Sequence, residues 1–386
     1  MRALLCLLAL AAAPAWAQPL VVGAALPLTG QLADLAADMQ KALLLWQENR
    51  NAEGGLLGRR IELKLLDDRS EASASTPLYE QLIDVERADL LLGPFGSAAT
   101  VSATAVAERR RRVLVNVTGV TGSTQRAGTR YVFQVPAPAA EYGTGALAVV
   151  KAAGYQRVHV VARNDPAARE AAARFVAQAN AAGLEAAAVE PATAGQIPDQ
   201  IAKARARDAQ AWIAFGQPED AADMVKAFKR IGYAPWLFLA QGAAEPRFIL
   251  LVGRDAEYTL GISPYQPSFR TRGNDAFVQA WRKRWSSEPG VVAATAYAAA
   301  LVLEAGVRGA QGVETERLST ALAALELETP IGLYRVDANG MQVGVKPVIV
   351  QILGGKREIV WPEALATAKW RLPYPRWDER PGRGAQ

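Results

Sequence analysis

The chain has 386 residues, 51% of which are hydrophobic, and it carries a net charge of +5 with one histidine and one cysteine. This length and apolar content suit two folded domains and exclude a disordered chain. The basic residues are scattered and are not interleaved with aromatic side chains, so we expect no nucleic-acid partner.

The N-terminus has the pattern of an export signal. Arg2 precedes an apolar stretch at 3–13, and residues 15–17 form an A-x-A site, which predicts cleavage before Gln18. The apolar stretch is too short to span a bilayer, and we predict no later membrane span. Cys6 lies inside the signal, so we expect no disulfide and no thiol chemistry in the mature chain.

The first third of the chain alternates apolar runs with helical patterns. The runs predict strands at 19–26, 61–66, 90–92 and 113–117, and spacings of three and four predict helices at 31–51, 77–87 and 98–107. This alternation predicts an α/β fold with a doubly wound parallel sheet. Ligands of such sheets bind outside the carboxyl ends of the strands. Six polar side chains lie there and favour a small polar ligand: Thr29, Asp67, Ser97, Thr100, Thr118 and Thr121.

The stretch 90–107 predicts an anion site. Gly93, Pro94 and Gly96 break the strand, and Ser97 stands at the expected N-cap of the helix. The first N–H groups of a helix have no intrahelical partner and favour negative charge. The alternative interpretation is an ordinary strand-to-helix turn, which needs no ligand.

After a proline-marked crossover at 133–138, the alternation restarts. Strands are predicted at 157–162, 184–189, 211–215, 236–240 and 257–263, and helices at 141–153, 167–182, 197–207 and 218–231. A second crossover at 264–267 precedes three consecutive helices, at 274–285, 291–309 and 316–325, which should cover an existing sheet. A third crossing near 330 leads to short strands at 333–336 and 348–352 and an irregular tail at 361–377.

These crossings predict two lobes joined by a hinge. We expect a signal peptide at 1–17, an N-terminal lobe at 18–138 plus 265–330, and a C-terminal lobe with the tail at 139–264 plus 331–386. A cleft between two sheet edges can close over a ligand by rotation about such a hinge.

Six segments resemble the periplasmic leucine/isoleucine/valine-binding protein family. They are 22–30 (VGAALPLTG), 51–58 (NAEGGLLG), 61–68 (IELKLLDD), 92–97 (LGPFGS), 232–235 (GYAP) and 360–362 (VWP). Their order and spacing carry the resemblance, which covers nearly the whole mature chain. It implies the type I periplasmic binding fold, with two doubly wound parallel-sheet lobes and a three-crossing hinge. It also implies a periplasmic receptor that feeds an inner-membrane ABC permease.

The resemblance also implies a ligand site. It places the ligand's carboxylate on Ser97, Gly119 and Thr121. In the other lobe, positions that usually hold an aromatic and an acidic residue hold Gln217 and Gln241 here. A neutral amide pairs with an ammonium much more weakly than a carboxylate does. Branched-chain amino acids are the ligands that the family implies, but we predict tolerance of ligands without an α-ammonium, namely keto acids, aromatic acids or amides.

Other candidate residues have two interpretations each. Thr100 adds a hydroxyl at the anion site, and Leu35 either lines an apolar pocket or packs within its lobe. Asp67 and its neighbour Asp68 either perform acid–base chemistry or hold loop backbone, and we favour the second role. We expect His159 to be packed and Asp165 to cap a helix rather than bind a ligand.

Three functions are compatible with these residues. The first is the ABC import receptor, and the second is a ligand-sensing protein of the same fold that signals to a regulator. The third is a hydrolase or lyase using Asp67, Asp68 or His159, but the sequence has no nucleophile–base pair for it. We therefore expect no enzyme, no cofactor and no metal, and a periplasmic monomer whose ligand is an amino acid or related carboxylate.

Overall fold

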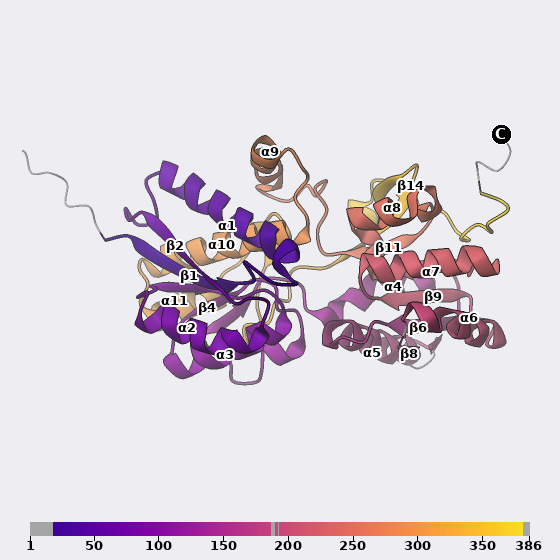
Figure 1. Cartoon of the computed structure of the whole chain (residues 1–386), viewed down its shortest axis with the longest axis horizontal. Helices are drawn as coiled ribbons and strands as arrows, with labels where there is room; N and C mark the ends of the chain where they lie inside the picture. The colour runs from indigo at the N-terminus through magenta and orange to yellow at the C-terminus, as the bar shows by residue number, and fades with distance from the viewer. Residues whose placement is uncertain (1–17, 187–189, 192, 381–386) are drawn as a thin grey trace, which may run out of the picture.

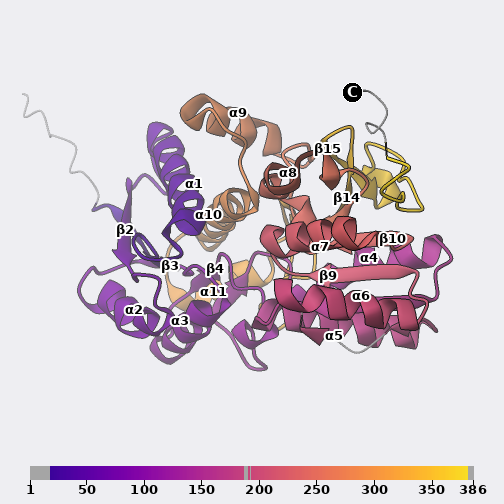
Figure 2. The same cartoon turned by 45° about the vertical axis from the view of Figure 1, so that its right-hand side comes forward.

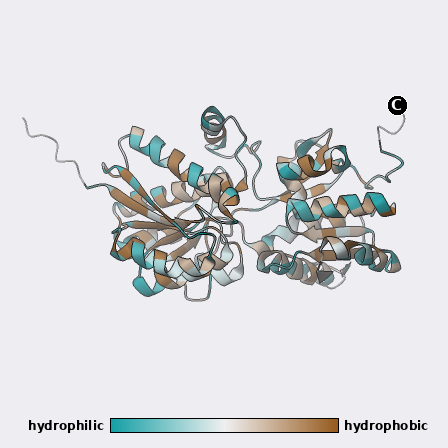
Figure 3. Ribbon diagram, viewed as in Figure 1, coloured by the Kyte–Doolittle hydropathy of each residue, from teal (hydrophilic) through white to brown (hydrophobic). Residues whose placement is uncertain are grey.

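The structure is a computed structural model that describes residues 18–186, 190–191 and 193–380, and the predicted signal peptide lies outside them. Two lobes lie side by side along the long axis, each built around its own β-sheet (Figure 1). They remain distinct in a view turned by 45° (Figure 2). Hydrophobic residues gather in the sheets and on the inner sides of the helices, whereas the outer sides are largely hydrophilic (Figure 3).

The first sheet is parallel and has the order β2-β1-β3-β4-β5. Its strands are β1 (Leu20–Leu26), β2 (Ile61–Asp67), β3 (Leu90–Leu92), β4 (Leu114–Asn116) and β5 (Val132–Gln134). Its two faces are covered by α2 (Ser75–Asp84) with α3 (Ser97–Arg110), and by α1 (Ala33–Ala52) with α10 (Val291–Ala310). The predicted doubly wound parallel sheet is confirmed in this lobe.

Three helices after β11 return to the first sheet, as predicted: α9 (Asn274–Trp285), α10 and α11 (Thr315–Ala323). α10 packs against α1 and α11, and Trp46 and Trp281 are fully buried there. With 20 residues, α10 is long and apolar enough to cross a membrane by length and composition alone. However, 72% of its apolar window is buried inside the lobe, so it is a core helix.

The second sheet is mixed, with the order β15-β14-β11-β10-β9-β6-β7 and with β8 also paired to β6. Its strands are β6 (Arg157–Ala162), β7 (Glu185–Ala186), β8 (Glu190–Pro191), β9 (Ala211–Phe215), β10 (Leu237–Ala240), β11 (Leu260–Ser263), β14 (Val348–Leu353) and β15 (Lys356–Trp361). Residues 187–189 of the predicted strand 184–189 lie outside the described residues. We expected an all-parallel sheet, but β14 is antiparallel to β11 and β15. The tight turn at Gly354–Gly355 makes a hairpin where a parallel pair would need a crossover helix.

Helices cover both faces of the second sheet. One face carries α4 (Tyr142–Ala152) and α5 (Pro166–Ala181), and the other carries α6 (Ile197–Ala206), α7 (Pro218–Ile231) and α8 (Pro246–Val252). The tail is anchored on the second of these faces, because Tyr374 and Trp377 are buried and the indole N–H of Trp377 donates to the Tyr233 carbonyl at 2.7 Å. The predicted irregular strap therefore belongs to the core of this lobe.

Short 3-10 turns lie in the connections: η1 (Ala72–Ala74), η2 (Gly122–Thr124), η3 (Ala139–Glu141), η4 (Ala194–Gln196), η5 (Gln241–Ala244), η6 (Gly253–Ala256) and η7 (Glu363–Leu365). Two of them position the candidate site. η2 follows β4 in the first lobe, and η5 follows β10 in the second.

The third crossing between the lobes lies later than position 330. A hairpin of β12 (Leu327–Thr329) and β13 (Gly332–Tyr334) comes first. The chain then stays beside the first sheet, where Gly340 accepts a backbone hydrogen bond from β5 at 2.8 Å and the Gln342 amide donates to Val135 at 3.1 Å. It joins the second sheet at Val348, so the chain after β13 contacts the first sheet before it enters the second.

Candidate functional site

A glycine turn leads from β3 into α3. Gly96 is the N-cap residue of α3, and its φ of 86° lies in the left-handed region that favours glycine. Ser97 is the first helical residue, so the prediction of Ser97 as N-cap is wrong by one position. The Ser97 hydroxyl does not cap the helix; it contacts the loop after β4.

Ser97 ties the loops after β3 and β4 together. Its Oγ accepts the N–H of Val120 at 3.1 Å and the N–H of Thr121 at 3.4 Å. A serine hydroxyl also has one hydrogen to donate, and no acceptor for it is found among the residues that the structure describes. The loop therefore fixes the hydroxyl oxygen while its hydrogen remains able to bind a carboxylate oxygen.

Gly119 lies where no side chain fits. A Cβ there would lie 2.7 Å from the side chain of Thr100, which is buried and donates to the Gly96 carbonyl at 2.8 Å. The Gly119 N–H donates to Asn116 Oδ1 at 2.8 Å, and its carbonyl accepts from Asn116 Nδ2 at 2.9 Å. Both backbone groups of Gly119 are thus used inside the loop, which Thr100 supports by packing.

Asn116 is a site residue that the sequence analysis did not single out. It is the last residue of β4 and is fully buried. An asparagine at the end of a strand with a glycine three residues later is a turn signal. That pattern was available in the sequence and would have identified Asn116 as the residue that shapes the loop.

Thr121 and Thr118 complete this edge of the first lobe. Thr121 is buried, and its Oγ1 lies 2.8 Å from the Oγ of Ser123. Thr118 Oγ1 accepts the N–H of Gly96 at 2.8 Å, so the loops after β3 and β4 are joined a second time. An edge held in this way is preorganised, which lowers the cost of binding a ligand.

Gln217 and Gln241 come together at the carboxyl ends of β9 and β10. A Cβ on Gly242, the residue after Gln241, would lie 2.2 Å from the backbone of Gln217. Gln217 is exposed and its N–H donates to Asp220 Oδ2 at 2.8 Å, whereas Gln241 is half-buried. The second lobe therefore presents two neutral amides at this edge, as the sequence analysis expected of these positions.

The charged groups at the end of β6 pair with one another. Arg163 lies 3.4 Å from Asp220 Oδ2 and 3.6 Å from Asp165 Oδ2. Asp165 is the N-cap of α5, and its Oδ1 accepts the N–H of Ala168 at 2.9 Å. The prediction that Asp165 is a helix cap is confirmed.

One contact joins α5 in the second lobe to the first-lobe loop. Both carboxylate oxygens of Glu170 lie 3.0 Å from the amide nitrogen of Gly122, the residue after Thr121. α5 also packs against η3, which lies in the first crossing. The sequence analysis missed Glu170, because a glutamate within an amphipathic helix carries no signal for a contact with another lobe.

Asp67 and Asp68 hold backbone, as predicted. Asp67 Oδ1 accepts the N–H groups of Leu28 and Thr29 at 3.0 and 3.1 Å, and Oδ2 accepts the Thr29 hydroxyl at 2.7 Å. That hydroxyl and the N–H of Arg69 hold the pKa of Asp67 below its usual value. Burial raises the pKa of Asp68, whose Oδ1 accepts a neighbouring N–H.

Leu35 lies on α1 in the first lobe, and His159 lies on β6 in the second. Leu35 is 60% exposed on α1, so it does not pack inside its lobe. His159 is buried on β6, where its Nε2 lies 3.0 Å from Gln200 Oε1 and its ring lies 4.6 Å from that of Trp212. The prediction of a packed histidine is confirmed.

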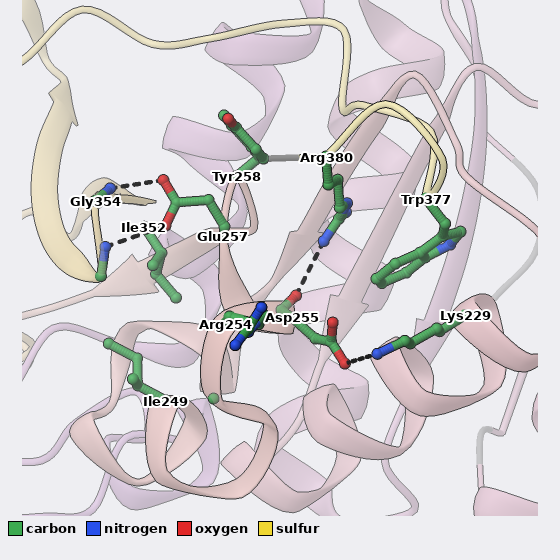
Figure 4. A pocket seen from close by; sticks show the side chains of 12 residues that line it. Lys229, Ile249, Arg254, Asp255, Glu257, Tyr258, Ile352, Gly354, Trp377 and Arg380 are labelled. Carbon is green, nitrogen blue, oxygen red and sulfur yellow. Dashed lines mark hydrogen bonds and ion pairs between the residues drawn. The ribbon is translucent and has the colours of Figure 1, made fainter. Parts of the chain in front are cut away.

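A surface pocket of about 740 Å³ lies in the second lobe, away from these loops (Figure 4). Lys229, Asp255, Trp377 and Arg380 are among the residues that line it. Lys229 pairs with Asp255 at 2.6 Å, and the Arg380 guanidinium lies 3.8 Å from the centre of the Trp377 ring. Arg380 also donates to the Asp255 carbonyl at 3.1 Å, so the pocket lies where the tail is anchored to the lobe. Within the described ranges, no group of three His, Cys, Asp or Glu residues could hold a metal ion.

Residues 19–356 match the family model described as periplasmic binding protein. A Leu/Ile/Val-binding protein homolog 7 of Brucella suis is 23% identical over 94% of this chain and 96% of its own length.

Solved structures share the fold at low identity. The solute-binding protein of an ABC transporter from R. palustris, in complex with benzoate, has a TM-score of 0.75 at 22% identity and covers 93% of this chain and 97% of its own. The branched-chain amino acid transporter substrate-binding protein LivJ from Streptococcus pneumoniae, in complex with isoleucine, has a TM-score of 0.73 at 22% identity and covers 89% of this chain and 99% of its own.

Proposed function

The chain belongs to the periplasmic binding protein family, and from this premise we propose that it is the receptor of an ABC importer that binds a small organic carboxylate between its lobes. The observation that carries the ligand class is Ser97, whose oxygen is fixed by two loop N–H groups while its hydrogen stays free to donate. It sits at the N-terminus of α3, where the helix dipole favours an anion.

The ligands of two structural neighbours support a carboxylate as the ligand class, but they do not support one particular compound. Isoleucine in one structural neighbour and benzoate in another share a carboxylate and an apolar body, but only isoleucine carries an ammonium. Those ligands belong to those proteins. For this chain, we propose the shared part: a carboxylate held by Ser97 and Thr121, with branched-chain amino acids as the first candidates.

We propose that the protein binds its ligand and does not catalyse a reaction on it. The family and the fold are those of substrate-binding proteins. Asp67 and Asp68, the candidates for acid–base work, are committed to loop backbone. The proposal includes export by the predicted signal peptide, a periplasmic monomer and an inner-membrane permease as partner. The second candidate role is sensing, in which the same ligand-bound form would contact a regulator.

A ligand screen by thermal shift tests the proposal. A ligand that binds only the folded state at 100 times its Kd stabilises that state by about 2.7 kcal/mol. We expect at least one amino acid or aromatic acid to raise the melting temperature without being converted, as judged by mass spectrometry. If no small carboxylate shifts the transition at millimolar concentration, or if a product appears, the proposal is wrong.

A further inference from the structure

Glu170 is half-buried on α5 and lies beside the loop that follows β4. Its two oxygens share the single N–H of Gly122, each at 3.0 Å, although a carboxylate can accept about four hydrogen bonds. Among the described residues, no lysine or arginine nitrogen lies within 4 Å of either oxygen.

Arg169 and Arg174 are the arginines nearest to Glu170 in the sequence, and neither forms an ion pair with it among the described residues. Arg163 lies between Asp165 and Asp220, at 3.6 and 3.4 Å. Arg169 donates to the side-chain oxygen of Asn164 at 3.1 Å. Among the described residues, no cation therefore pairs directly with the Glu170 carboxylate, which faces the first-lobe loop.

We infer that Glu170 determines specificity at this site: its charge makes the site prefer carboxylates that also carry an ammonium or a similar cationic donor. The inference rests on the proposed function. Gly122 follows Thr121 directly, so a ligand carboxylate held by Ser97 and Thr121 lies close to a second carboxylate, that of Glu170. Like charges repel at such a site, whereas an ammonium on the ligand balances both carboxylates and uses the free acceptor positions of Glu170.

The sequence analysis found no residue in the second lobe that could pair with a ligand ammonium, and Glu170 fills that role. Gln217 and Gln241 supply no formal charge, so an ammonium would be unpaired if the second lobe offered only these two residues. Glu170 reaches the first-lobe loop from α5 rather than from the ends of β9 or β10. The negative charge thus enters the site from a different element of the same lobe.

The test is a comparison of matched ligands by calorimetry on the mature protein. The pairs are leucine with 4-methyl-2-oxopentanoate and phenylalanine with phenylpyruvate, which differ only at the α-position. We expect wild-type protein to bind the amino acid of a pair at least about tenfold more tightly. E170Q should lower amino-acid affinity about tenfold or more, the usual value of a hydrogen bond to a charged group, and leave keto-acid affinity unchanged or raised.

Two variants of Gly122 distinguish the effect of the Glu170 charge from the effect of its hydrogen bond to the loop. Gly122 is the first residue of η2, and Thr121 before it is extended with ψ 148°, so Gly122→Pro fits the backbone while it removes the N–H bound by Glu170. Gly122→Ala keeps that N–H, and its Cβ would lie 3.4 Å from Glu170 Oε1, which is near ordinary contact. Both variants should keep the amino-acid preference, because the Glu170 charge remains.

The outcomes are distinct. Equal binding of amino and keto acid by wild type, or an equal effect of E170Q on both, would overturn the inference while leaving the proposed function intact. Loss of the preference in Gly122→Pro would also overturn it, by showing that Glu170 acts only through its contact with the loop. If neither pair binds, the proposed amino-acid-like ligand class fails and the inference fails with it. Glu185→Gln, at the opposite end of the second sheet, is the matched control and should change neither affinity.

Discussion

The hydroxyl oxygen of Ser97 lies 3.1 Å from the amide nitrogen of Val120, so the first residue of α3 and the loop after β4 form one unit. In a parallel sheet the carboxyl ends of adjacent strands meet, and β3 and β4 are adjacent here. The bond therefore fixes two loops with respect to each other at the edge where a ligand is expected.

The first prediction concerns Ser97→Ala. The variant loses the donor to a ligand carboxylate, so affinity should fall about tenfold or more, because a hydrogen bond to a charged group contributes about 1.5–3 kcal/mol. The melting temperature should fall slightly, because the Val120 N–H loses its acceptor. Calorimetry measures the first effect. Ser102→Ala on the same helix is the control, and wild-type affinity in Ser97→Ala would remove Ser97 from the site.

The second prediction concerns Asn116→Ala. This change leaves both the N–H and the carbonyl of buried Gly119 without a partner, and each such group costs about 1–3 kcal/mol. We expect urea denaturation to show a fall of about 2 kcal/mol or more in the free energy of unfolding. Asn116→Asp should also be destabilising, since its carboxylate still accepts the Gly119 N–H but puts a buried charge against the Gly119 carbonyl. If Asn116→Ala is neutral, Asn116 does not support the loop.

The sequence predicted the parts of the fold that follow from local pattern. β3 (Leu90–Leu92) and α7 (Pro218–Ile231) were predicted at their observed bounds, because a buried apolar run and a proline-started amphipathic helix leave few alternatives. β5 and β15 were missed. β5 is buried, but Pro136 and Pro138 follow it closely, so the stretch was interpreted as a crossover. β15 begins with exposed Lys356 and lacks a continuous apolar run.

Some residues near the candidate site could be predicted from the sequence, and others could not. That Thr100 and Gly119 bind the ligand stays a prediction; in the structure they pack against each other and their polar groups bond within the loops. Glu170 could not be predicted, since only the relative placement of the two lobes brings α5 to the loop. The predicted tolerance of ligands without an ammonium stays a prediction. It considered Gln217 and Gln241 alone, and the inference about Glu170 reverses the expected order of affinities.

The third prediction concerns the pH dependence of Asp67. Its pKa is lowered in the folded protein from an ordinary value of 3.8, first by the Thr29 hydroxyl and then by backbone N–H groups. A group with a lowered pKa stabilises the fold above its unfolded pKa, and this contribution disappears as the pH falls through the folded pKa. Asp67→Asn should therefore lower the melting temperature at pH 7, with a gap to wild type that narrows below about pH 4. A gap that stays constant down to pH 2 would contradict a role for the charge.

The fourth prediction concerns the tail. Trp377 is 8% exposed and bonded to the Tyr233 carbonyl, so Trp377→Ala should reduce the free energy of unfolding by about 3 kcal/mol. Ligand affinity should not change, because Trp377 lies away from the loops of the candidate site. Trp236→Ala is the matched control, since Trp236 is 54% exposed and should cost much less. A lower ligand affinity in Trp377→Ala at a temperature where it is folded would show that the tail acts on the site.

The last prediction is that the lobes close on the ligand. The chain passes between the two sheets at residues 135–141, 264–273 and 346–347, which are three segments on which rigid lobes can rotate. Side chains proposed to bind come from both lobes, Ser97 from one and Gln241 from the other, so a small ligand touches both only if they approach. Small-angle X-ray scattering should show a smaller radius of gyration at saturating ligand than without it. The ligand is one identified by the thermal-shift screen, and a scattering curve that stays the same at saturation would mean that binding occurs without closure.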